Sequence, residues 1–550
     1  MFLTNLGCKL NQAENDRLAH GFLAAGHRLA ASLAEADLHV VNSCTVTAAA
    51  ARASRKAARA GARADGGGQG GGGGGDEGGG TGRLRTVLTG CYATASPAEA
   101  AGLAGVDLVV ANRDKESLVE RVRQAFESAP APVPATDPGA APAAPAAARA
   151  EDAARAAPAR HAVAPSHAPA APPFAPAALL PDGNTRALLK VEDGCDMGCA
   201  FCIIPWTRGR QRSRPPEELV AEARALVAAG YREIVVTGVQ ISAYRGGAAP
   251  SGGADAGVPR GTMRLGGLVR ALLAALPEAA ALAEPAALPE PAALPEPAAL
   301  AEPAALPESA ALPEPAAPSA PPGLLPPGRH RAGLPAARLR LTSIAPWQLD
   351  DEILGLWSDP RLCRHLHLSL QSGSTATLRR MRRPYTAGRF ARLVASVRAA
   401  VPGMAVTTDV IVGFPGETDA EFDESLATVA ALGFAKVHVF PFSPRPGTAA
   451  AELPDAVAPR EQRLRMDRML AVAERAAADF HAAHVGSRAT VLWEHPREGR
   501  GNGLTDNYIR VFGPAGETPW NRFGEVELEA AVAGGMLGRP LACGDPAALG

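Results

Sequence analysis

Three stretches of low complexity divide this 550-residue chain into the parts that can form a hydrophobic core. Residues 65–82 are almost entirely glycine, residues 128–183 are rich in alanine and proline, and residues 276–335 contain a repeated Leu-Pro-Glu-Pro-Ala-Ala phrase. Such segments bury too little apolar surface to offset the entropy that is lost on ordering, so we expect disordered inserts. The rest predicts an N-terminal domain over 1–127, a linker over 128–183, a central domain over 184–484 and a C-terminal domain over 485–550.

The N-terminal domain alternates short apolar runs with amphipathic segments. The pattern predicts strands over 1–7, 37–42, 86–90 and 107–111, and helices over 11–25, 46–60 and 115–126. This order is typical of an α/β fold, so we expect a parallel sheet with helices on both faces.

Three cysteines of this domain follow the carboxyl ends of predicted strands: Cys8, Cys44 and Cys91. Parallel strands bring those ends to one edge of the sheet, where ligands bind in open α/β folds. A single such cysteine is more often a small buried hydrophobe than a ligand. Three in the same topological position, each in a glycine or serine/threonine turn, predict an iron–sulfur site with one ligand missing.

A second set of cysteines, Cys195, Cys199 and Cys202, lies within one glycine-punctuated loop. Three thiolates wrapped around a cubane 4Fe–4S cluster leave one iron without a protein ligand, and an open metal site binds substrate or cofactor. The alternative is a structural zinc site completed by a distant histidine. Such sites usually show a second CxxC or HxxxH unit, and none lies nearby.

The central domain repeats the strand–helix order about six times. Strands are predicted over 187–191, 232–237, 338–342, 365–370, 405–412 and 436–440, with helices over 216–229, 265–275, 349–357, 390–400 and 419–432. Six units are fewer than the eight of a closed barrel, so we expect a partial (β/α)6 barrel whose open side suits a macromolecular substrate.

The C-terminal part begins with a long predicted helix over 460–484. Short strand-like runs follow over 489–494, 508–512 and 525–531, separated by glycine and asparagine turns. This pattern predicts a small antiparallel β-barrel.

Several groups of residues resemble one family, the radical S-adenosylmethionine (SAM) methylthiotransferases. The matching segments are Asn5–Gln12, Asn42–Thr47, Thr89–Tyr92, Asp193–Gly209, His365–Gly373 and Asp409–Glu417. The segment Leu504–Tyr508 is similar to the family's TRAM domain. The Cys-Thr-Val-Thr at residue 44 and the His-Leu-His-Leu at residue 365 most resemble the branch that acts on N6-threonylcarbamoyladenosine in tRNA.

The resemblance implies an enzyme that adds a methylthio group to C2 of that nucleoside next to the anticodon. Its cofactors would be two 4Fe–4S clusters and SAM, which is both methyl donor and radical source. Cys195, Cys199 and Cys202 would hold the catalytic radical SAM cluster, and Cys8, Cys44 and Cys91 the auxiliary cluster. We expect SAM contacts at or near the strand ends, from Thr237, Gly238, Ser343, Gln371, Asp409 and Gly413.

RNA contacts are expected from a basic strip beside the cluster loop and from the tail. The candidates are Arg208, Arg210, Arg212, Arg214 and Tyr508. A charge run is otherwise a solvated face, and Tyr508 can equally belong to a core. His365 and His367 share one face of a strand, which suits metal ligands but fits a hydrogen-bonded pair lining the barrel better.

Composition adds few constraints on partners. The formal net charge is −1, and eight cysteines are too few for a disulfide framework, which favours a reducing cytoplasm. We expect tRNA and an electron donor such as flavodoxin or ferredoxin as partners, a monomer, and no membrane or DNA. The alternatives are action on isopentenyladenosine in tRNA or on an aspartate of a ribosomal protein, or a non-catalytic iron–sulfur RNA-binding protein.

Overall fold

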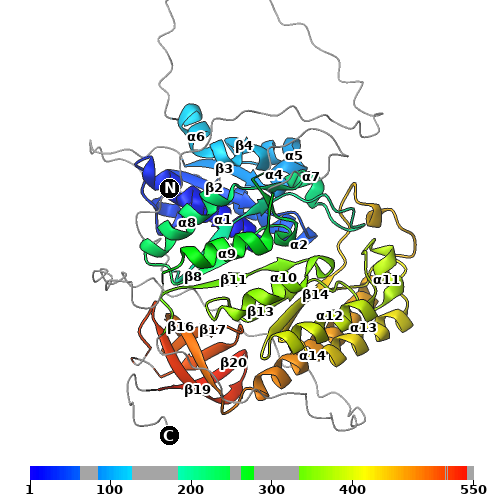
Figure 1. The fold of residues 1–550 in the computed structure, drawn as a ribbon. Helices are drawn as coiled ribbons and strands as arrows, with labels where there is room; N and C mark the ends of the chain where they lie inside the picture. The colour runs from blue at the N-terminus through cyan, green and yellow to red at the C-terminus, as the bar shows by residue number, and fades with distance from the viewer. Residues whose placement is uncertain are drawn as a thin grey trace, which may run out of the picture.

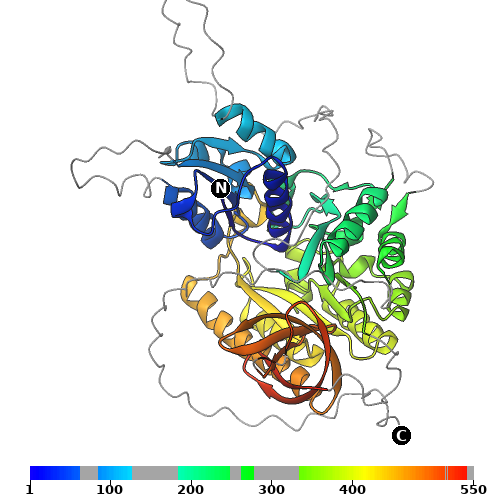
Figure 2. The same ribbon diagram turned by 90° about the vertical axis from the view of Figure 1, so that its left-hand side faces the viewer.

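The computed structural model describes residues 1–61, 84–126, 184–247, 262–277, 334–514, 516 and 518–541. The predicted glycine-rich insert, the linker and residues 278–333 of the repeat segment lie outside the described residues. Three regions follow one another down the molecule, with the N-terminal sheet above, the central sheet in the middle and a closed barrel beneath (Figures 1 and 2).

The N-terminal region is a four-stranded parallel sheet in the order β1-β2-β3-β4. Its strands are β1 (Phe2–Asn5), β2 (Leu38–Ser43), β3 (Arg85–Gly90) and β4 (Leu108–Val110). Alternate side chains point to opposite faces, so Val40 packs under α1 (Lys9–Ala24) and α6 (Leu118–Phe126), and Val41 packs under α2 (Ala48–Ala58). The predicted parallel sheet with helices on both faces is confirmed.

Two short helices in this region, α4 (Cys91–Ala95) and α5 (Pro97–Ala101), have no counterpart among the predicted elements. The helix predicted over 115–126 begins instead as a 3₁₀ segment, η2 (Asn112–Ser117), before α6. The η2 segment matters for the site because it carries Asn112 and Lys115, both of which are buried.

The central region has six strand positions, formed by a three-stranded and a four-stranded parallel sheet that follow one another as one open layer. Its strands are β5 (Arg186–Lys190), β8 (Glu233–Thr237), β11 (Arg338–Leu341), β12 (Ser343–Ile344), β13 (His365–Leu368), β14 (Ala405–Val412) and β15 (Lys436–Pro441). Only Thr342 separates β11 from β12; β11 pairs with β8, and β12 pairs with β13. The strand order β5-β8-β11/β12-β13-β14-β15 therefore matches the predicted six strand–helix units.

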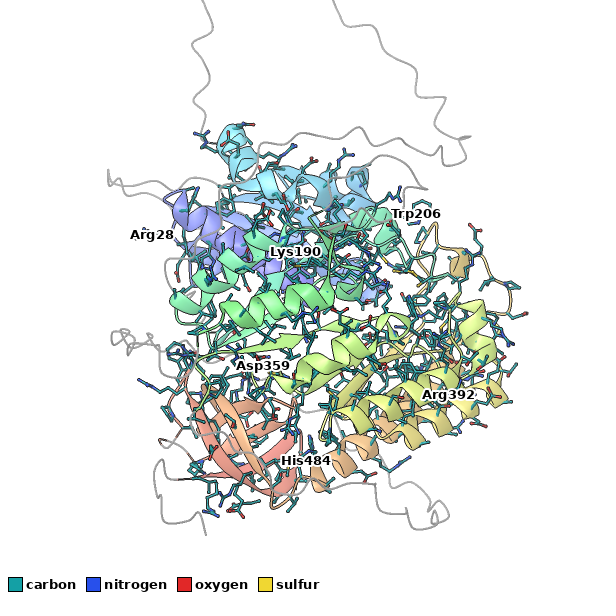
Figure 3. All side chains as sticks on the ribbon, in the orientation of Figure 1. Arg28, Lys190, Trp206, Asp359, Arg392 and His484 are labelled. Carbon is teal, nitrogen blue, oxygen red and sulfur yellow. The ribbon has the colours of Figure 1, made fainter. Side chains whose placement is uncertain are left out.

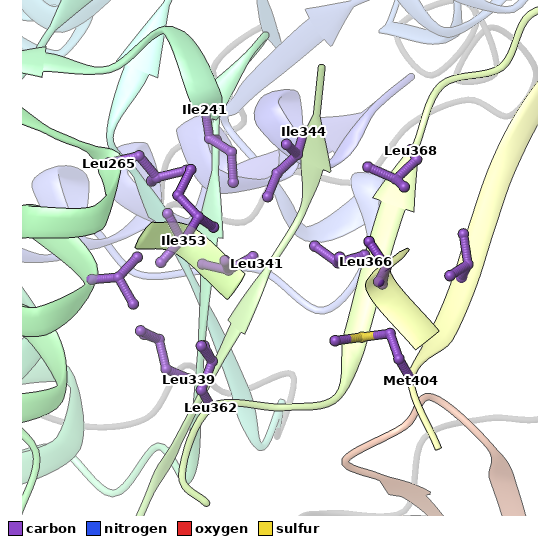
Figure 4. Packing of buried hydrophobic residues seen from close by; sticks show 14 of the residues in the cluster. Ile241, Leu265, Leu339, Leu341, Ile344, Ile353, Leu362, Leu366, Leu368 and Met404 are labelled. Atoms are coloured by element: carbon purple, nitrogen blue, oxygen red, sulfur yellow. The ribbon is translucent and has the colours of Figure 1, made fainter. Parts of the chain in front are cut away.

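The helices of this region cover the outer side of the sheet. They are α8 (Pro216–Ala228), α9 (Leu265–Ala275), α10 (Asp351–Leu354), α12 (Ala387–Ala400) and α13 (Asp419–Leu432). Leu339 and Leu341 of β11 and Leu366 and Leu368 of β13 are fully buried, and Leu265 of α9 belongs to the same core cluster (Figure 4). The residues that alternate with these leucines are arginines and histidines, so the inner face of the sheet is polar.

The C-terminal region is a closed five-stranded barrel that follows helix α14 (Pro459–Ala482). Its strands are β16 (Arg488–Arg497), β17 (Arg500–Thr505), β18 (Arg510–Gly513), β19 (Phe523–Val532) and β20 (Gly535–Pro540). The expectation of an entirely antiparallel barrel is wrong, because β18 and β20 run parallel. β17 and β20 escaped prediction because glycines interrupt their alternation; a Cβ at Gly503 would lie 2.3 Å from Val491 Cγ1.

Among the described residues, every helix is too short or too polar to cross a membrane.

Candidate active site

The three dispersed cysteines meet at the carboxyl edge of the N-terminal sheet. Cys44 and Cys91 directly follow β2 and β3 and are buried, whereas Cys8 precedes α1 and is exposed. Burial raises the pKa of the Cys44 thiol to about 11, and the neighbouring Cys91 and Cys8 thiols raise it further. The topology thus brings together thiols that are far apart in sequence.

Two glycines allow the backbone to pass close to the cysteines at this edge of the sheet. Gly7 has φ +107°, and a Cβ there would lie 2.8 Å from Cys44 Sγ. Gly90 has φ +99°, and a Cβ there would lie 2.3 Å from the Ser43 carbonyl oxygen. An L side chain is strained at both positions and would collide with the cysteine-bearing backbone or thiol.

The contiguous cysteines lie in the loop between β6 (Glu192–Asp193) and α7 (Ile204–Arg208). Burial raises the pKa of Cys202 to about 12, and the Cys199 and Cys195 thiols nearby raise it further. The Met197 amide donates to Cys195 Sγ at 3.4 Å, and the Arg383 guanidinium donates to Cys199 Sγ at 3.2 Å. Such donors stabilise the thiolate form that binds iron.

A buried ion network lies between the two triads and consists of Glu14, Lys115, Lys190, Asp193 and Arg208. Glu14 contacts Lys115 at 2.5 Å, Lys190 at 2.9 Å and Arg208 at 2.8 Å. Asp193 contacts Lys190 at 2.8 Å and Arg208 at 3.0 Å. Lys190 lies centrally, where the N-terminal region meets the central sheet (Figure 3).

The charges of this network compensate one another. Burial disfavours ionisation of Glu14, but the charges of Lys115, Lys190 and Arg208 hold its pKa well below its usual range. Removing one partner would leave the others charged and buried, which costs several kcal/mol. The contact between the two regions is therefore sensitive to the loss of any one of these partners.

Hydrogen bonds carry the network to the immediate neighbours of the cysteines. Lys115 donates to Asn42 Oδ1 at 3.0 Å, two residues before Cys44. Asn112, on the same 3₁₀ segment as Lys115, donates to Cys91 Sγ at 3.5 Å and to the Thr207 carbonyl at 2.9 Å. Asp193 lies two residues before Cys195. The relative placement of the two triads is thus set by groups buried between them.

Five of the six residues predicted to contact SAM lie at or near strand ends. Thr237 ends β8, Gly238 and Gly413 directly follow β8 and β14, Ser343 begins β12, and Gln371 lies three residues after β13. Asp409 differs, because it lies inside β14, in register with His438 of β15.

Glu192 is a candidate functional residue that the sequence analysis missed. Its Oε2 accepts from the Gln240 amide at 2.8 Å, and a Cβ at Gly238 would lie 2.6 Å from it. Its Oε1 is buried and has no hydrogen-bond partner among the described residues. Burial raises the pKa of Glu192 to about 8, and the carboxyl group lies close enough to Cys195 to influence that thiol. Nothing in the sequence singled out Glu192, because a glutamate three residues before a cysteine belongs to no recognisable motif.

The predicted RNA-contact residues fall into different environments. Arg208 is 3% exposed and belongs to the buried ion network, so its guanidinium pairs with buried carboxylates and is not available at the surface. Arg214 is half-buried on Glu222 at 2.7 Å. Arg210 and Arg212 keep exposed side chains, at 82% and 52%.

The histidines and the tyrosine lie on the inner face of the central sheet. His365 and His367 both hydrogen-bond Thr407 Oγ1, at 3.1 and 3.0 Å, as expected for a pair lining the sheet. The ring of Tyr508 stacks on His365 with centroids 4.3 Å apart, so one of its faces is covered.

The donor set of the two cysteine triads fits iron–sulfur clusters. Each thiolate of a cubane binds a different iron, so its ligands stand further apart than those of a single ion. Each triad converges, is partly buried and receives N–H donors, which is the donor set that a cluster requires.

Comparison with known families agrees with this geometry. Residues 189–249 and 333–429 match the Radical SAM superfamily. Residues 1–111 match a second family, described as Uncharacterized protein family UPF0004. The cysteine loop and the open parallel sheet thus define a radical SAM enzyme.

Similar proteins of known function indicate which family of radical SAM enzymes the chain belongs to. The chain is 30% identical over 512 residues to the Threonylcarbamoyladenosine tRNA methylthiotransferase MtaB of Bacillus subtilis, covering 92% of this chain and 88% of the relative. The protein of the same name from Thermotoga maritima is 28% identical, with coverages of 95% and 92%. The chain belongs to the radical SAM methylthiotransferase family. Its cofactors are therefore SAM and 4Fe–4S clusters.

Two further similarities were found. A tRNA-2-methylthio-N(6)-dimethylallyladenosine synthase from Anaeromyxobacter sp. is 32% identical over 360 residues, or 64% of this chain and 59% of the relative. Among solved structures, the radical SAM methyltransferase TsrM from Kitasatospora setae aligns with a TM-score of 0.43 at 14% identity, over 80% of this chain and 67% of that chain.

Proposed function

We propose that this protein adds a methylthio group to C2 of N6-threonylcarbamoyladenosine next to the anticodon of tRNA, forming 2-methylthio-N6-threonylcarbamoyladenosine. The observation that carries the proposal is that two convergent cysteine triads occur in one chain that aligns with 88% of a relative named for that nucleoside.

The triads have separate roles in this proposal. Cys195, Cys199 and Cys202 hold the catalytic cluster that binds SAM, and Cys8, Cys44 and Cys91 hold the auxiliary cluster. When bound, the clusters and SAM supply the radical that activates C2 of the adenine and the methylthio group that is transferred there. The protein stabilises the thiolates through Arg383, Asn112 and the Met197 amide.

The strand-end residues complete the SAM site in the same proposal. Thr237, Gly238, Ser343, Gln371 and Gly413 surround the end of the sheet where the contiguous triad lies. Glu192 adds a buried carboxyl oxygen that has no hydrogen-bond partner in the described part of the chain, which suits an N–H or ammonium group of a ligand. Because these positions are partly enclosed, they keep water away from reactive species.

Partners and organisation follow from the same assignment. We assign tRNA as substrate, with exposed Arg210 and Arg212 as phosphate contacts and the closed C-terminal barrel as a TRAM domain. The open six-strand sheet is the partial (β/α)6 barrel, within domain boundaries of 1–127, 184–484 and 485–550. The proposal also includes an electron donor, flavodoxin or ferredoxin, and a monomeric protein with no membrane or DNA partner. It places the protein in the cytoplasm, where cysteines stay reduced.

A second candidate substrate is the adenosine that carries a dimethylallyl group. It is supported by the Anaeromyxobacter relative, which aligns with a smaller share of this chain, 64% against 92%. The two substrates share the reaction at C2 and differ only in the group on N6.

The direct test is mass spectrometry of tRNA nucleosides from a strain lacking this gene. We expect 2-methylthio-N6-threonylcarbamoyladenosine to disappear and its precursor to accumulate. The wild-type gene should restore the product, and a Cys199→Ala gene should not. Loss of a different methylthio nucleoside would assign the enzyme to another substrate. No change in any methylthio product would contradict the proposed function.

A further inference from the structure

The inner face of the central sheet carries a group of polar side chains that the cluster sites do not use. Along β14 and β15, Val410 and Val437 pack in the outer core, whereas Asp409 and His438 point to the other face. We use the name polar chamber for a set of five side chains, Lys9, His367, Asp409, Lys436 and His438; the name denotes these residues. An apolar filling would be expected if this face served only stability.

The chamber is held together by specific contacts. His367 hydrogen-bonds Asp409 Oδ2 through Nε2 at 3.1 Å, and its ring lies 6.1 Å from that of His438. All three side chains remain partly accessible, with Asp409 29% exposed. The pair between His367 and Asp409 therefore orients a carboxylate that a ligand can still reach.

Lys9 enters the chamber from the N-terminal region. It directly follows Cys8, and its Nζ lies 5.6 Å from the centroid of the Tyr508 ring, which stacks on His365. Its charge acts on both His365 and His438. The chamber thus begins beside a cysteine of the dispersed triad and reaches the inner face of the sheet.

The lysines of this chain are few and unevenly placed. There are five, at positions 9, 56, 115, 190 and 436. Lys115 and Lys190 belong to the buried ion network, while the charges of Lys9 and Lys436 both lower the pKa of His438. No carboxylate in the described part of the chain pairs with Lys9 or Lys436. By contrast, Arg338 and Arg340 of the same sheet bond Glu233 at 2.6 and 2.7 Å.

Two exposed lysines that have no carboxylate partner among the described residues, together with a carboxylate oriented by His367, suit a ligand that carries both an anion and N–H or O–H donors. The threonylcarbamoyl group has a carboxylate, a hydroxyl and ureido N–H groups. A dimethylallyl group is a hydrocarbon and would leave these side chains desolvated without partners, which opposes its binding.

We propose that the polar chamber binds the N6 substituent of the modified adenosine, with Lys9 and Lys436 pairing with its carboxylate and Asp409 accepting from its N–H or O–H groups. This inference rests on the proposed function and names the residues that select the substrate. An RNA backbone phosphate has the same anionic chemistry, so the test must separate phosphate from carboxylate.

The test is binding of anticodon stem-loops of one sequence that carry adenosine, N6-threonylcarbamoyladenosine or N6-dimethylallyladenosine at the modified position. Affinities are measured by fluorescence anisotropy with the cluster-loaded protein and with Lys9→Met, Lys436→Met and Asp409→Asn variants. Lys56→Met is the matched control, because Lys56 is an exposed lysine of α2 outside the chamber.

We expect the wild type to prefer the threonylcarbamoyl stem-loop over the unmodified one. Lys9→Met and Lys436→Met should each weaken binding of the threonylcarbamoyl stem-loop by about 10-fold and leave the unmodified one unchanged. Asp409→Asn should weaken the same stem-loop selectively, and Lys56→Met should change neither. Lys436→Met keeps the test valid if Lys9→Met disturbs the adjacent Cys8.

Equal weakening of all three stem-loops would assign the lysines to phosphate and overturn the inference, as would unchanged binding in every variant. Conversion of the threonylcarbamoyl tRNA by the wild type is measured in parallel. Suppose that the wild type converts the threonylcarbamoyl tRNA while the variants still prefer the threonylcarbamoyl stem-loop as strongly as the wild type does. Then only the inference about the polar chamber fails. If the wild type converts another nucleoside instead, the proposed function fails first.

Discussion

The two cysteine triads occupy the same molecule but are built in different ways. The contiguous triad lies in one loop between β6 and α7, so its spacing is local. The dispersed triad depends on three strand ends that meet only because β1, β2 and β3 run parallel. The contiguous site therefore needs only the conformation of one loop, whereas the dispersed site needs the whole sheet to form. We therefore expect the dispersed site to be more sensitive to changes in packing.

Their electrostatic surroundings differ as well. Cys199 receives one guanidinium, from Arg383. The dispersed triad instead borders the buried ion network, because Asn112 bonds Cys91 and Lys115 bonds Asn42. The network also reaches the contiguous triad, since Asp193 accepts a hydrogen bond from the Gly194 amide next to Cys195, so its perturbation should affect both triads.

The largest expected effect separates the triads by activity. Cys199→Ala should abolish reductive cleavage of SAM and all methylthio product, because the catalytic cluster loses a ligand. Cys44→Ala should also abolish methylthio product but keep SAM cleavage within a few-fold of wild type. Chromatography of the SAM cleavage product and of tRNA nucleosides measures both, and loss of SAM cleavage in Cys44→Ala would contradict independent roles.

The next effect concerns the network between them. Glu14→Gln leaves Lys115, Lys190 and Arg208 buried with one acidic partner fewer, so the free energy of unfolding should fall by about 3–5 kcal/mol. Chemical denaturation followed by tryptophan fluorescence measures this. The matched control is Glu120→Gln, on an exposed pair with Arg123, which should leave the unfolding transition unchanged. Equal transitions in the two variants would contradict the network's structural role.

A smaller effect is expected from two glycines, one at each triad. Gly7→Ala places a Cβ 2.8 Å from Cys44 Sγ at φ +107°, so it should reduce cluster binding by the dispersed triad. Gly198→Ala meets no described atom within 4 Å and should be tolerated by the contiguous triad. Iron content and visible absorption of the reconstituted variants compare them; a larger loss in Gly198→Ala would reverse the comparison.

The smallest effect is a pH dependence at Glu192. Burial holds its pKa at about 8 in the folded protein, against 4.5 in the unfolded chain. Between these values the unfolded chain has lost a proton that the folded protein keeps, so stability should fall as the pH rises from about 5 to 8. Glu192→Gln should make the decline in melting temperature shallower, by about 3 °C over that range. Parallel curves for the two proteins would contradict the raised pKa.

Local signals made several elements predictable. The bounds predicted for α13, 419–432, match the structure, because Thr418 and Glu421 form a capping box and Gly433 ends the helix with φ +55°. The cysteines were identifiable from spacing and strand ends. Long-range pairs were not: Arg208 looked like part of a surface strip, since nothing in its neighbourhood reveals Glu14, 194 residues away. The polar chamber was missed for the same reason, because the fold alone brings the charge of Lys9 near enough to influence His438.

The central claim is that one chain holds two separate clusters, and iron analysis of anaerobically reconstituted protein tests it most directly. We predict about eight irons per chain for the wild type and about four for either Cys199→Ala or Cys44→Ala, with a 4Fe–4S spectrum in each case. A wild type with about four irons, or a single substitution that removes all iron, would contradict the claim.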